Sequence, residues 1–423
     1  MGLSLAIAIF GGLVLAFFAA TQTGIGEDRW TETVQAHGDL QLFGWVAVFV
    51  AVLTFEFIIR VNARGAPLPI APRLTVLGTL AGGALLRAAG QLWNAQLGFL
   101  WPIGAGLIVV GSLVFAWLVW SVKPPRPVRL DPQPLWFWTG AAWLISAAVA
   151  GFAGSLQATG GIMPLEDSRL TVELVIRGLV LCSIFAVGVR AFPGHLGLPM
   201  LELRRHRALY VLMNASLVVF ALGTGAFFLP DAGWLRHIGD FGLAVTLLLA
   251  TWWMGLPSLM QRFGWQPYYR AMIPIAWLGF VAYAVALGAG AIFPGWGERD
   301  ILAEGGIRHI FLLGAMAPLM IGMADIVLAR FGTGEIAGER WLPVAFALVF
   351  VAWPLRVVPP LLTSASGGAA YQSLLGSADV LAAAGLAVAA GVCLRNARQI
   401  REIHQRRLRM HAEREREAIQ VAQ

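Results

Sequence analysis

Long apolar runs, each close to 20 residues and separated by short polar loops, dominate the chain. About 20 residues of α-helix cross the ~30 Å hydrocarbon core of a bilayer, so each run predicts one membrane span. Twelve runs meet this length, near residues 3–21, 36–59, 74–92, 99–121, 134–157, 171–192, 208–229, 237–261, 271–293, 306–328, 341–362 and 374–394. The pattern therefore predicts an all-α polytopic membrane protein with about twelve transmembrane helices.

Charge gives these spans an orientation. Most Lys and Arg lie in the loops after the second, fourth, sixth, eighth and tenth spans and in the tail, whereas the opposite loops mix few cations with Asp and Glu. Lys and Arg beside a span tend to stay in the cytoplasm, so we expect both termini to be cytoplasmic. The net charge of +7 is what this topology requires, and it does not indicate nucleic-acid binding.

The predicted organisation is simple. Residues 1–394 form a transmembrane domain, and residues 395–423, which alternate Arg, Glu, Gln and His, continue the last span as a charged cytoplasmic helix. The starts of the second and eighth spans resemble each other, His37-Gly-Asp against His237-Ile-Gly-Asp, and both spans run in the same direction. This similarity suggests two parallel six-helix halves.

Three of the seven histidines lie at equivalent depths in the predicted topology. His37, His237 and His309 each stand near the start of a span, and the three spans run the same way across the bilayer. Histidine is costly in hydrocarbon and binds metals readily, so the three are candidate haem or metal ligands. The alternative is that such interfacial histidines cap helices or hydrogen-bond to loop carbonyls.

Arginines inside the spans point to the same leaflet. Arg87, Arg177 and Arg356 lie on the histidines' side, and Arg308 precedes His309. Buried guanidinium groups need anionic partners, and the two propionates of a haem would supply them. Arg177 follows Glu173 by four residues, a spacing that favours a local ion pair, so we expect Arg177 to be structural. Arg87, Arg308 and Arg356 are the candidates for cofactor binding.

Two stretches resemble one family. His37-Gly-Asp-Leu-Gln-Leu-Phe-Gly-Trp is similar to the H-A-H-E-M-L-F-G stretch of NnrS-type proteins, and the segment that begins Arg308-His309-Ile-Phe-Leu-Leu-Gly-Ala is similar to a late helix of that family. The contexts of Arg87 and Arg356 also look like the family's helix arginines. The twelve-helix layout extends the resemblance over essentially the whole chain.

The resemblance implies a haem- and copper-containing protein of the bacterial inner membrane, connected with nitric oxide metabolism. By this resemblance His37 and His309 are the motif histidines, and the haem is a non-covalent, b-type one because the chain has no C-x-x-C-H attachment motif. Asp39 stands where the family has its second motif histidine. This departure argues against a copper site, and we expect copper to be absent or substoichiometric.

Two other functions fit the composition. The chain is 58% hydrophobic with 17 Trp, which suits a non-catalytic membrane subunit that docks other subunits of a respiratory or photosynthetic complex. An anion transporter with two six-helix halves would use the intramembrane arginines to bind its substrate. No phosphate-binding loop, hydrolase elbow or zincin motif occurs, so the sequence leaves open whether the protein is an enzyme.

The charge pattern generates a topological prediction. Reporter fusions at Pro125 and Gly338 should lie in the cytoplasm, because the loops that contain these two residues are rich in cations. A fusion at Glu298 should lie in the periplasm. Paired activities of a periplasmic phosphatase and a cytoplasmic fluorescent reporter measure this. A periplasmic signal at Pro125 would contradict the orientation and the shared leaflet of the histidines.

Overall fold

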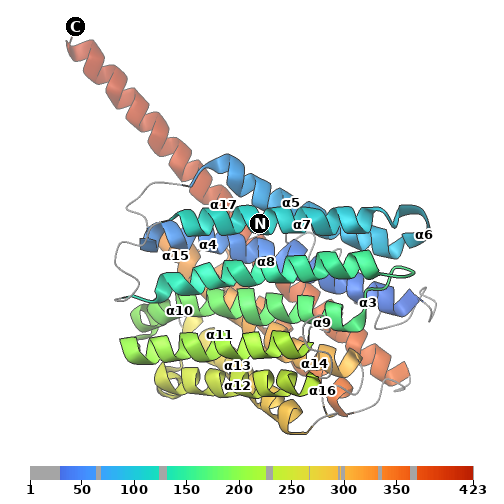
Figure 1. Cartoon of the computed structure of the whole chain (residues 1–423). Coiled ribbons are helices and arrows are strands. Elements are labelled where there is room, and N and C mark those ends of the chain that lie inside the picture. Colours follow the sequence, from blue (N-terminus) through green and yellow to red (C-terminus); the bar gives the residue numbers. More distant parts are fainter. Residues whose placement is uncertain are drawn as a thin grey trace.

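The computed structural model describes residues 29–62, 68–122, 131–224, 232–265, 267–293, 296, 301–331, 336–362 and 369–422. Within these ranges the regular secondary structure is helical, apart from one isolated antiparallel bridge between Thr159 and Ile162, and short loops join the helices. The helices lie side by side in a bundle (Figure 1). The all-helical class that the apolar pattern predicts is confirmed.

The helices follow the predicted spans closely. They are α3 (Trp30–Asp39), α4 (Val48–Asn62), α5 (Ile70–Leu92), α6 (Asn94–Leu97), α7 (Leu100–Ser121), α8 (Gln133–Gln157), α9 (Leu165–Glu173), α10 (Leu181–Leu196), α11 (Leu203–Thr224), α12 (Gly233–Trp253), α13 (Tyr269–Ile292), α14 (Ile301–Phe311), α15 (Ala317–Phe331), α16 (Leu342–Leu362) and α17 (Ala369–Ala422). Three π-helical segments join α3 to α4, α9 to α10 and α14 to α15 without a break, namely Leu40–Ala47, Leu174–Val180 and Leu312–Met316.

Nine of the described helices are long and apolar enough to cross a membrane. In addition, α5 is 23 residues long and packs along α7. α12 is 21 residues long and packs along α11 and α13. The first predicted span, 3–21, lies outside the described residues. The protein is therefore a multi-pass helical membrane protein, and the count of twelve spans stays a prediction.

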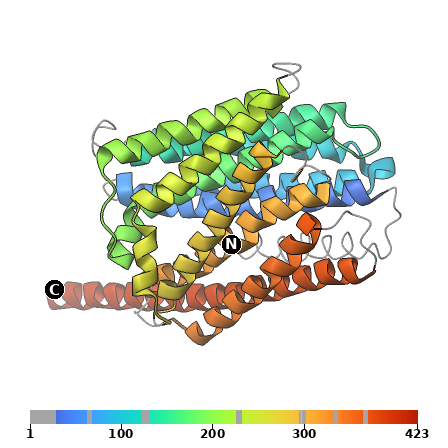
Figure 2. The ribbon, with the colours of Figure 1, turned by 90° about the horizontal axis from the view of Figure 1, so that it is seen from below.

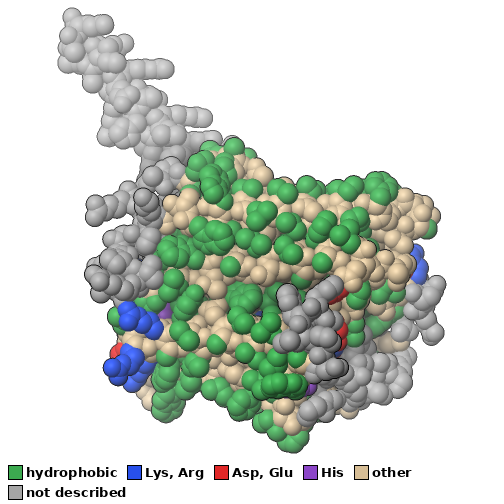
Figure 3. All heavy atoms as spheres, viewed as in Figure 1, with side chains coloured by type: hydrophobic (Ala, Val, Ile, Leu, Met, Phe, Trp, Pro, Cys, Tyr) green, Lys and Arg blue, Asp and Glu red, His purple; other side chains and the backbone are tan. Residues whose placement is uncertain are grey.

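The outer surface suits a hydrocarbon environment. Side chains such as Ile103, Trp117, Leu248, Leu278 and Val351 are exposed on their helices although they are apolar. Hydrophobic side chains are spread over the visible side of the bundle, and the Lys and Arg side chains that stand out on this face lie near its two ends (Figure 3). This is the distribution expected where lipid surrounds the middle of the helices and water surrounds their ends.

Glycines with positive φ angles follow α10 and α12, whereas α17, the last helix, continues without interruption to its end. α10 is followed by Gly197 and α12 is followed shortly by Gly255, both with positive φ angles (64° and 70°) that only glycine adopts readily. α17 runs for 54 residues and extends beyond the other helices (Figures 1 and 2). The charged tail, residues 395–422, is thus a direct continuation of the last apolar helix.

Backbones approach closely where α13 meets the π-helical segment Leu312–Met316. A Cβ atom on Gly279 would overlap the carbonyl group of Gly314, and a Cβ atom on Gly314 would lie 2.6 Å from the indole nitrogen of Trp353. Small residues at helix crossings let membrane helices gain dispersion contacts, since lipid provides no hydrophobic force between them. These glycines therefore hold α14 and α15 against α13 and α16.

We expect Gly279→Ala to destabilise the protein by about 1–3 kcal/mol, because the added methyl group must push backbone away from a close-packed crossing. Gly290→Ala is the matched control: Gly290 lies on the same helix and has nothing within 4 Å of its Cβ position. Thermal unfolding of the detergent-solubilised protein measures both. Equal midpoints for the two variants would show that the crossing tolerates a side chain.

Candidate functional site

The three π-helical segments mark the candidate site. Each begins within three residues of the chemistry-bearing residues that the sequence singles out: Asp39 precedes the first, Glu173 the second, and His309 lies three residues before the third. A π-helical turn inserts an extra residue into the helix, and such turns are frequent at functional sites. Here they occur in the three helices that carry His37, Arg177 and His309.

The structure brings His37 and His309 together from distant parts of the sequence. His37 on α3 and His309 on α14 are both partly buried. Arg356 on α16, His37 and Arg308 all lie close enough to interact electrostatically with the His309 imidazole. Three helices thus place two imidazoles and a guanidinium group in one region. We call His37, His309 and Arg356 the histidine site.

The His309 ring has a defined hydrogen bond. Its Nδ1 lies 2.6 Å from the backbone oxygen of Gly305, one helical turn earlier. A carbonyl oxygen only accepts, so Nδ1 carries the proton and donates it. The neutral ring then has its lone pair on Nε2, the arrangement by which metal-binding histidines are usually oriented. His309 is therefore held in the tautomer that a metal ion would require.

Arg87 on α5 lies beside the histidine helix and is fully buried. Its Nε is 3.0 Å from Oδ2 of Asp39, two residues after His37. Neither Nη1 nor Nη2 of Arg87 has a hydrogen-bond partner in the described part of the structure, although both are buried. A guanidinium group has five N–H donors, so the pair with Asp39 leaves several of them without an acceptor.

Arg356 on α16 is also paired with an aspartate on a neighbouring helix. Its Nε lies 3.4 Å from Oδ1 of Asp379 on α17, and its Nη1 is buried without a hydrogen-bond partner among the residues described. Buried N–H groups of this kind call for an acceptor, and the described residues do not provide one. The partners of Arg87 and Arg356 lie on other helices, which is why no local spacing in the sequence revealed them.

A larger set of ion pairs joins α9, α12 and α14. We call it the acid–base cluster; its members are Glu166, Arg169, Glu173, Arg177, Arg236, Asp240, Glu304 and Arg308. Arg177 pairs with Glu173 at 2.6 Å and with Asp240, donates to the Tyr283 hydroxyl at 3.1 Å and lies 4.4 Å from the Phe220 ring centre. Arg308 pairs with Glu173 at 2.7 Å.

The acid–base cluster is neutral as a whole, since it contains four arginines and four carboxylates. The prediction that Arg177 pairs with Glu173 and is structural agrees with this geometry. Arg308, which the sequence suggests as a cofactor residue, has Glu173 and Glu304 as partners, although it remains an electrostatic neighbour of His309. Its first role is therefore to hold α14 against α9.

His237 lies on α12, which packs against α11 and α13. α12 contributes the neighbouring Arg236 and Asp240 to the acid–base cluster. Within the described ranges, no group of three or more His, Cys, Asp and Glu side chains is placed to hold a metal ion. His37 lies within electrostatic range of His309, and His237 stays a further candidate ligand.

The sequence also missed several polar contacts away from the histidine site. His206 accepts a hydrogen bond from the Trp136 indole at 2.7 Å, and Asp325 accepts one from the Tyr269 backbone at the start of α13. Gln35 forms a two-way bond with the backbone of Met163. Each joins two helices or a helix and a loop. Polar residues in apolar helices were the available signal, but their partners depend on the packing.

Comparison with protein-family models and with curated proteins finds no match for this chain. The fold and the site by themselves define a multi-pass helical membrane protein with a partly buried histidine site and an adjacent neutral cluster of ion pairs.

The Asp39–Arg87 pair generates a stability prediction. Arg87→Met should lower the free energy of unfolding by about 3–5 kcal/mol, because it leaves Asp39 buried without a counter-charge. The double variant Asp39→Asn, Arg87→Met should recover most of this loss. Glu202→Gln is the control, since Glu202 pairs with Arg205 at the exposed surface and such pairs contribute about 0–1 kcal/mol.

Thermal unfolding in detergent measures these three variants and the single variant Asp39→Asn. A double variant as unstable as the sum of its single variants would contradict the idea that the two charges stabilise each other.

Proposed function

We propose that this chain is a haem-binding protein of the bacterial inner membrane, of the kind that NnrS-type proteins represent, and that it acts in nitric oxide or respiratory metabolism. The observation that carries the proposal is the state of His309. Its Nδ1 donates to Gly305, its Nε2 keeps the lone pair, and His37 lies nearby on a helix about 270 residues earlier in the chain. Haem iron takes such neutral imidazoles as axial ligands.

The arginines fit the acidic side of a haem. Arg356 lies near His309, and Arg87 is paired with Asp39, two residues from His37. Both have buried N–H groups without an acceptor in the described structure. Two propionates would supply acceptors through charge-assisted hydrogen bonds. His37 and His309 would hold the iron, Arg87 and Arg356 the propionates, and the bound haem would supply electron transfer or the binding of a diatomic gas.

Copper has less support. Asp39, which stands at the place of the family's second motif histidine, is engaged with Arg87. We propose that haem is the resident cofactor and that copper is absent or substoichiometric. Asp39→His would then raise the copper content measured by elemental analysis.

The ion pairs also bear on the alternatives. Arg87, Arg177, Arg308 and Arg356 each have a carboxylate partner. Arg87 and Arg356 also keep buried N–H groups that would donate to a free anion as well as to a propionate. The anion transporter and the non-catalytic membrane subunit are therefore both alternatives, and a colourless purified protein would favour them over the haem-binding protein.

The ligand assignment is tested by visible spectroscopy. We expect a Soret band in the purified protein, and we expect His37→Ala or His309→Ala to abolish or shift it, because loss of an axial ligand changes spin state or haem occupancy. His237→Ala is the matched control and should have little effect, since His237 matches the family motif least well of the three histidines.

Arg356→Ala should act differently from the histidine variants. It removes a propionate partner, so haem should be lost faster to a haem scavenger and the redox potential should shift, while the spectrum of the bound haem stays similar. A protein without a Soret band after expression with added haem precursor would overturn the proposed function. Equal effects of His237→Ala and His309→Ala would overturn the choice of ligands.

A further inference from the structure

A second feature lies on the same two helices as the histidine site. A cavity of about 580 Å³ opens between α4, α10, α15 and α17. Met316, at its edge, is seven residues after His309, and Trp45 is eight residues after His37. Because an α-helix rises about 1.5 Å per residue, the cavity begins about 10 Å from the histidines, measured along the helix axes.

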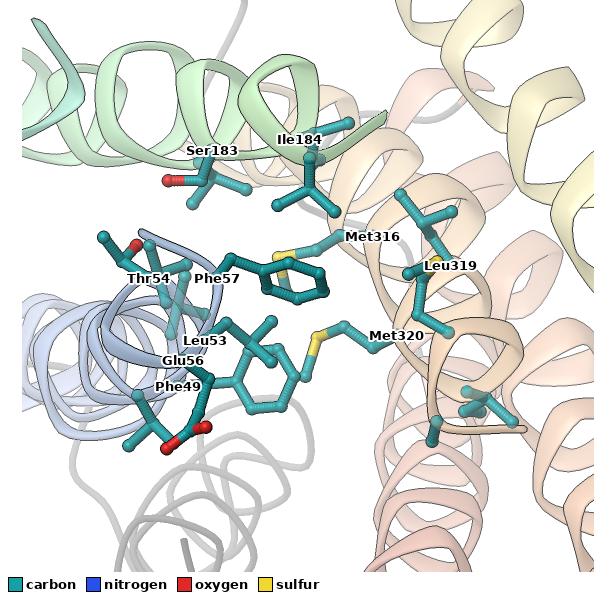
Figure 4. Close-up of a pocket in the computed structure, with 18 of the residues that line it drawn as sticks. Phe49, Leu53, Thr54, Glu56, Phe57, Ser183, Ile184, Met316, Leu319 and Met320 are labelled. Carbon is teal, nitrogen blue, oxygen red and sulfur yellow. The ribbon is translucent and has the colours of Figure 1, made fainter. Parts of the chain in front are cut away.

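The lining of the cavity is almost entirely apolar. Phe49, Phe57, Phe137 and Phe192 contribute rings, and Met316, Met320 and Met323 contribute thioethers. Phe57, Met316 and Met320 point toward one another across the space, whereas the Glu56 carboxylate lies at its edge (Figure 4). Rings and flexible thioethers bind planar apolar groups well, because rings stack and Met adapts its shape.

The position of the cavity limits its ligand. The segments Trp30–Ile58, Leu165–Leu196, Ala303–Ile326 and Tyr371–Gln399 that form it are all candidate membrane spans. A molecule that enters from the side of these helices must be soluble in the bilayer. The volume falls within the 300–1,000 Å³ typical of ligand pockets, which are mostly apolar with a few polar groups that fix orientation. Here Thr54, Glu56 and Ser183 are the polar lining residues.

We infer that this cavity binds an isoprenoid quinone or quinol. The planar ring would lie among Phe57, Met316 and Met320, the ring oxygens would face the hydroxyl and carboxylate groups of α4 and α10, and the apolar tail would leave between the helices into the lipid. A phospholipid acyl chain also suits an apolar space. It has no ring to stack, however, and it gives no account of an aromatic and thioether lining with polar groups at the edge. The site is separate from the histidine site, and binding there needs no haem.

Photolabelling of the full chain in detergent tests the inference. The probe is a photoreactive ubiquinone analogue with a short isoprenoid tail, and the comparison probe is a photoreactive fatty acid of similar length. The quinone analogue should label peptides of α4 and α15, and excess unlabelled quinone should suppress this labelling whereas excess phospholipid should not. This competition requires no variant, so a variant that fails to fold does not leave the question open.

A cavity-filling variant sharpens the test. Met320→Trp should weaken quinone labelling about tenfold, equivalent to about 1.4 kcal/mol of binding free energy. Leu278→Trp, on the exposed surface of α13 outside the cavity, is the matched control and should label normally. Labelling by the fatty acid that quinone does not displace, quinone labelling that phospholipid suppresses equally, or full labelling of Met320→Trp would each overturn the inference. A missing Soret band would bear only on the haem proposal.

Discussion

Neutralisation of charge within a low-dielectric interior is the constraint on which this structure depends. A charge in hydrocarbon costs several kcal/mol unless a partner and hydrogen bonds compensate it. In the described helices, the acid–base cluster and the Asp39–Arg87 and Arg356–Asp379 pairs compensate this cost. Because the Asp39–Arg87 and Arg356–Asp379 pairs and several pairs of the cluster join different helices, the cost of burying the charges also constrains which helices are linked. Such pairs link α3 to α5, α16 to α17, and α9 to both α12 and α14.

The π-helical segments connect this charge pattern to the site. Each widened turn occurs in a helix whose polar residues must meet partners on two or more neighbours. Glu173, for example, pairs with Arg177 on its own helix and with Arg308 on α14. An inserted residue shifts the register of the helix by about one position. Polar residues before the turn can then reach their ion-pair partners while the apolar residues after it still face the interior. The helices beyond these turns then resume regular geometry and line the apolar cavity.

The sequence was sufficient for the helices because the length and apolar content of a span are local properties. It was also sufficient to select His37, His309 and the arginines, since polar residues stand out in an apolar helix. It was not sufficient for their partners. Asp39 looks like a lost histidine when it is compared with a family motif, yet in the structure it holds Arg87. Likewise, Asp379 looks isolated until α17 packs on α16 and brings it to Arg356. His237 shares a predicted depth with the other two histidines, but depth does not say which side chains surround it.

The unbroken length of α17 gives the protein a mechanical property. Asp379 is fixed to α16 through Arg356, and Asn396 is fixed to the backbone of Ala337 by hydrogen bonds in both directions, at 2.9 and 3.0 Å. The helix continues beyond this second attachment to residue 422, and its full length is about 80 Å. A helix without a break tilts as one rigid body, and the hydrogen bonds of Asn396 mark the point about which it would pivot. A change in tilt at the Arg356 end would therefore appear, enlarged and reversed in direction, at the charged end outside the bundle.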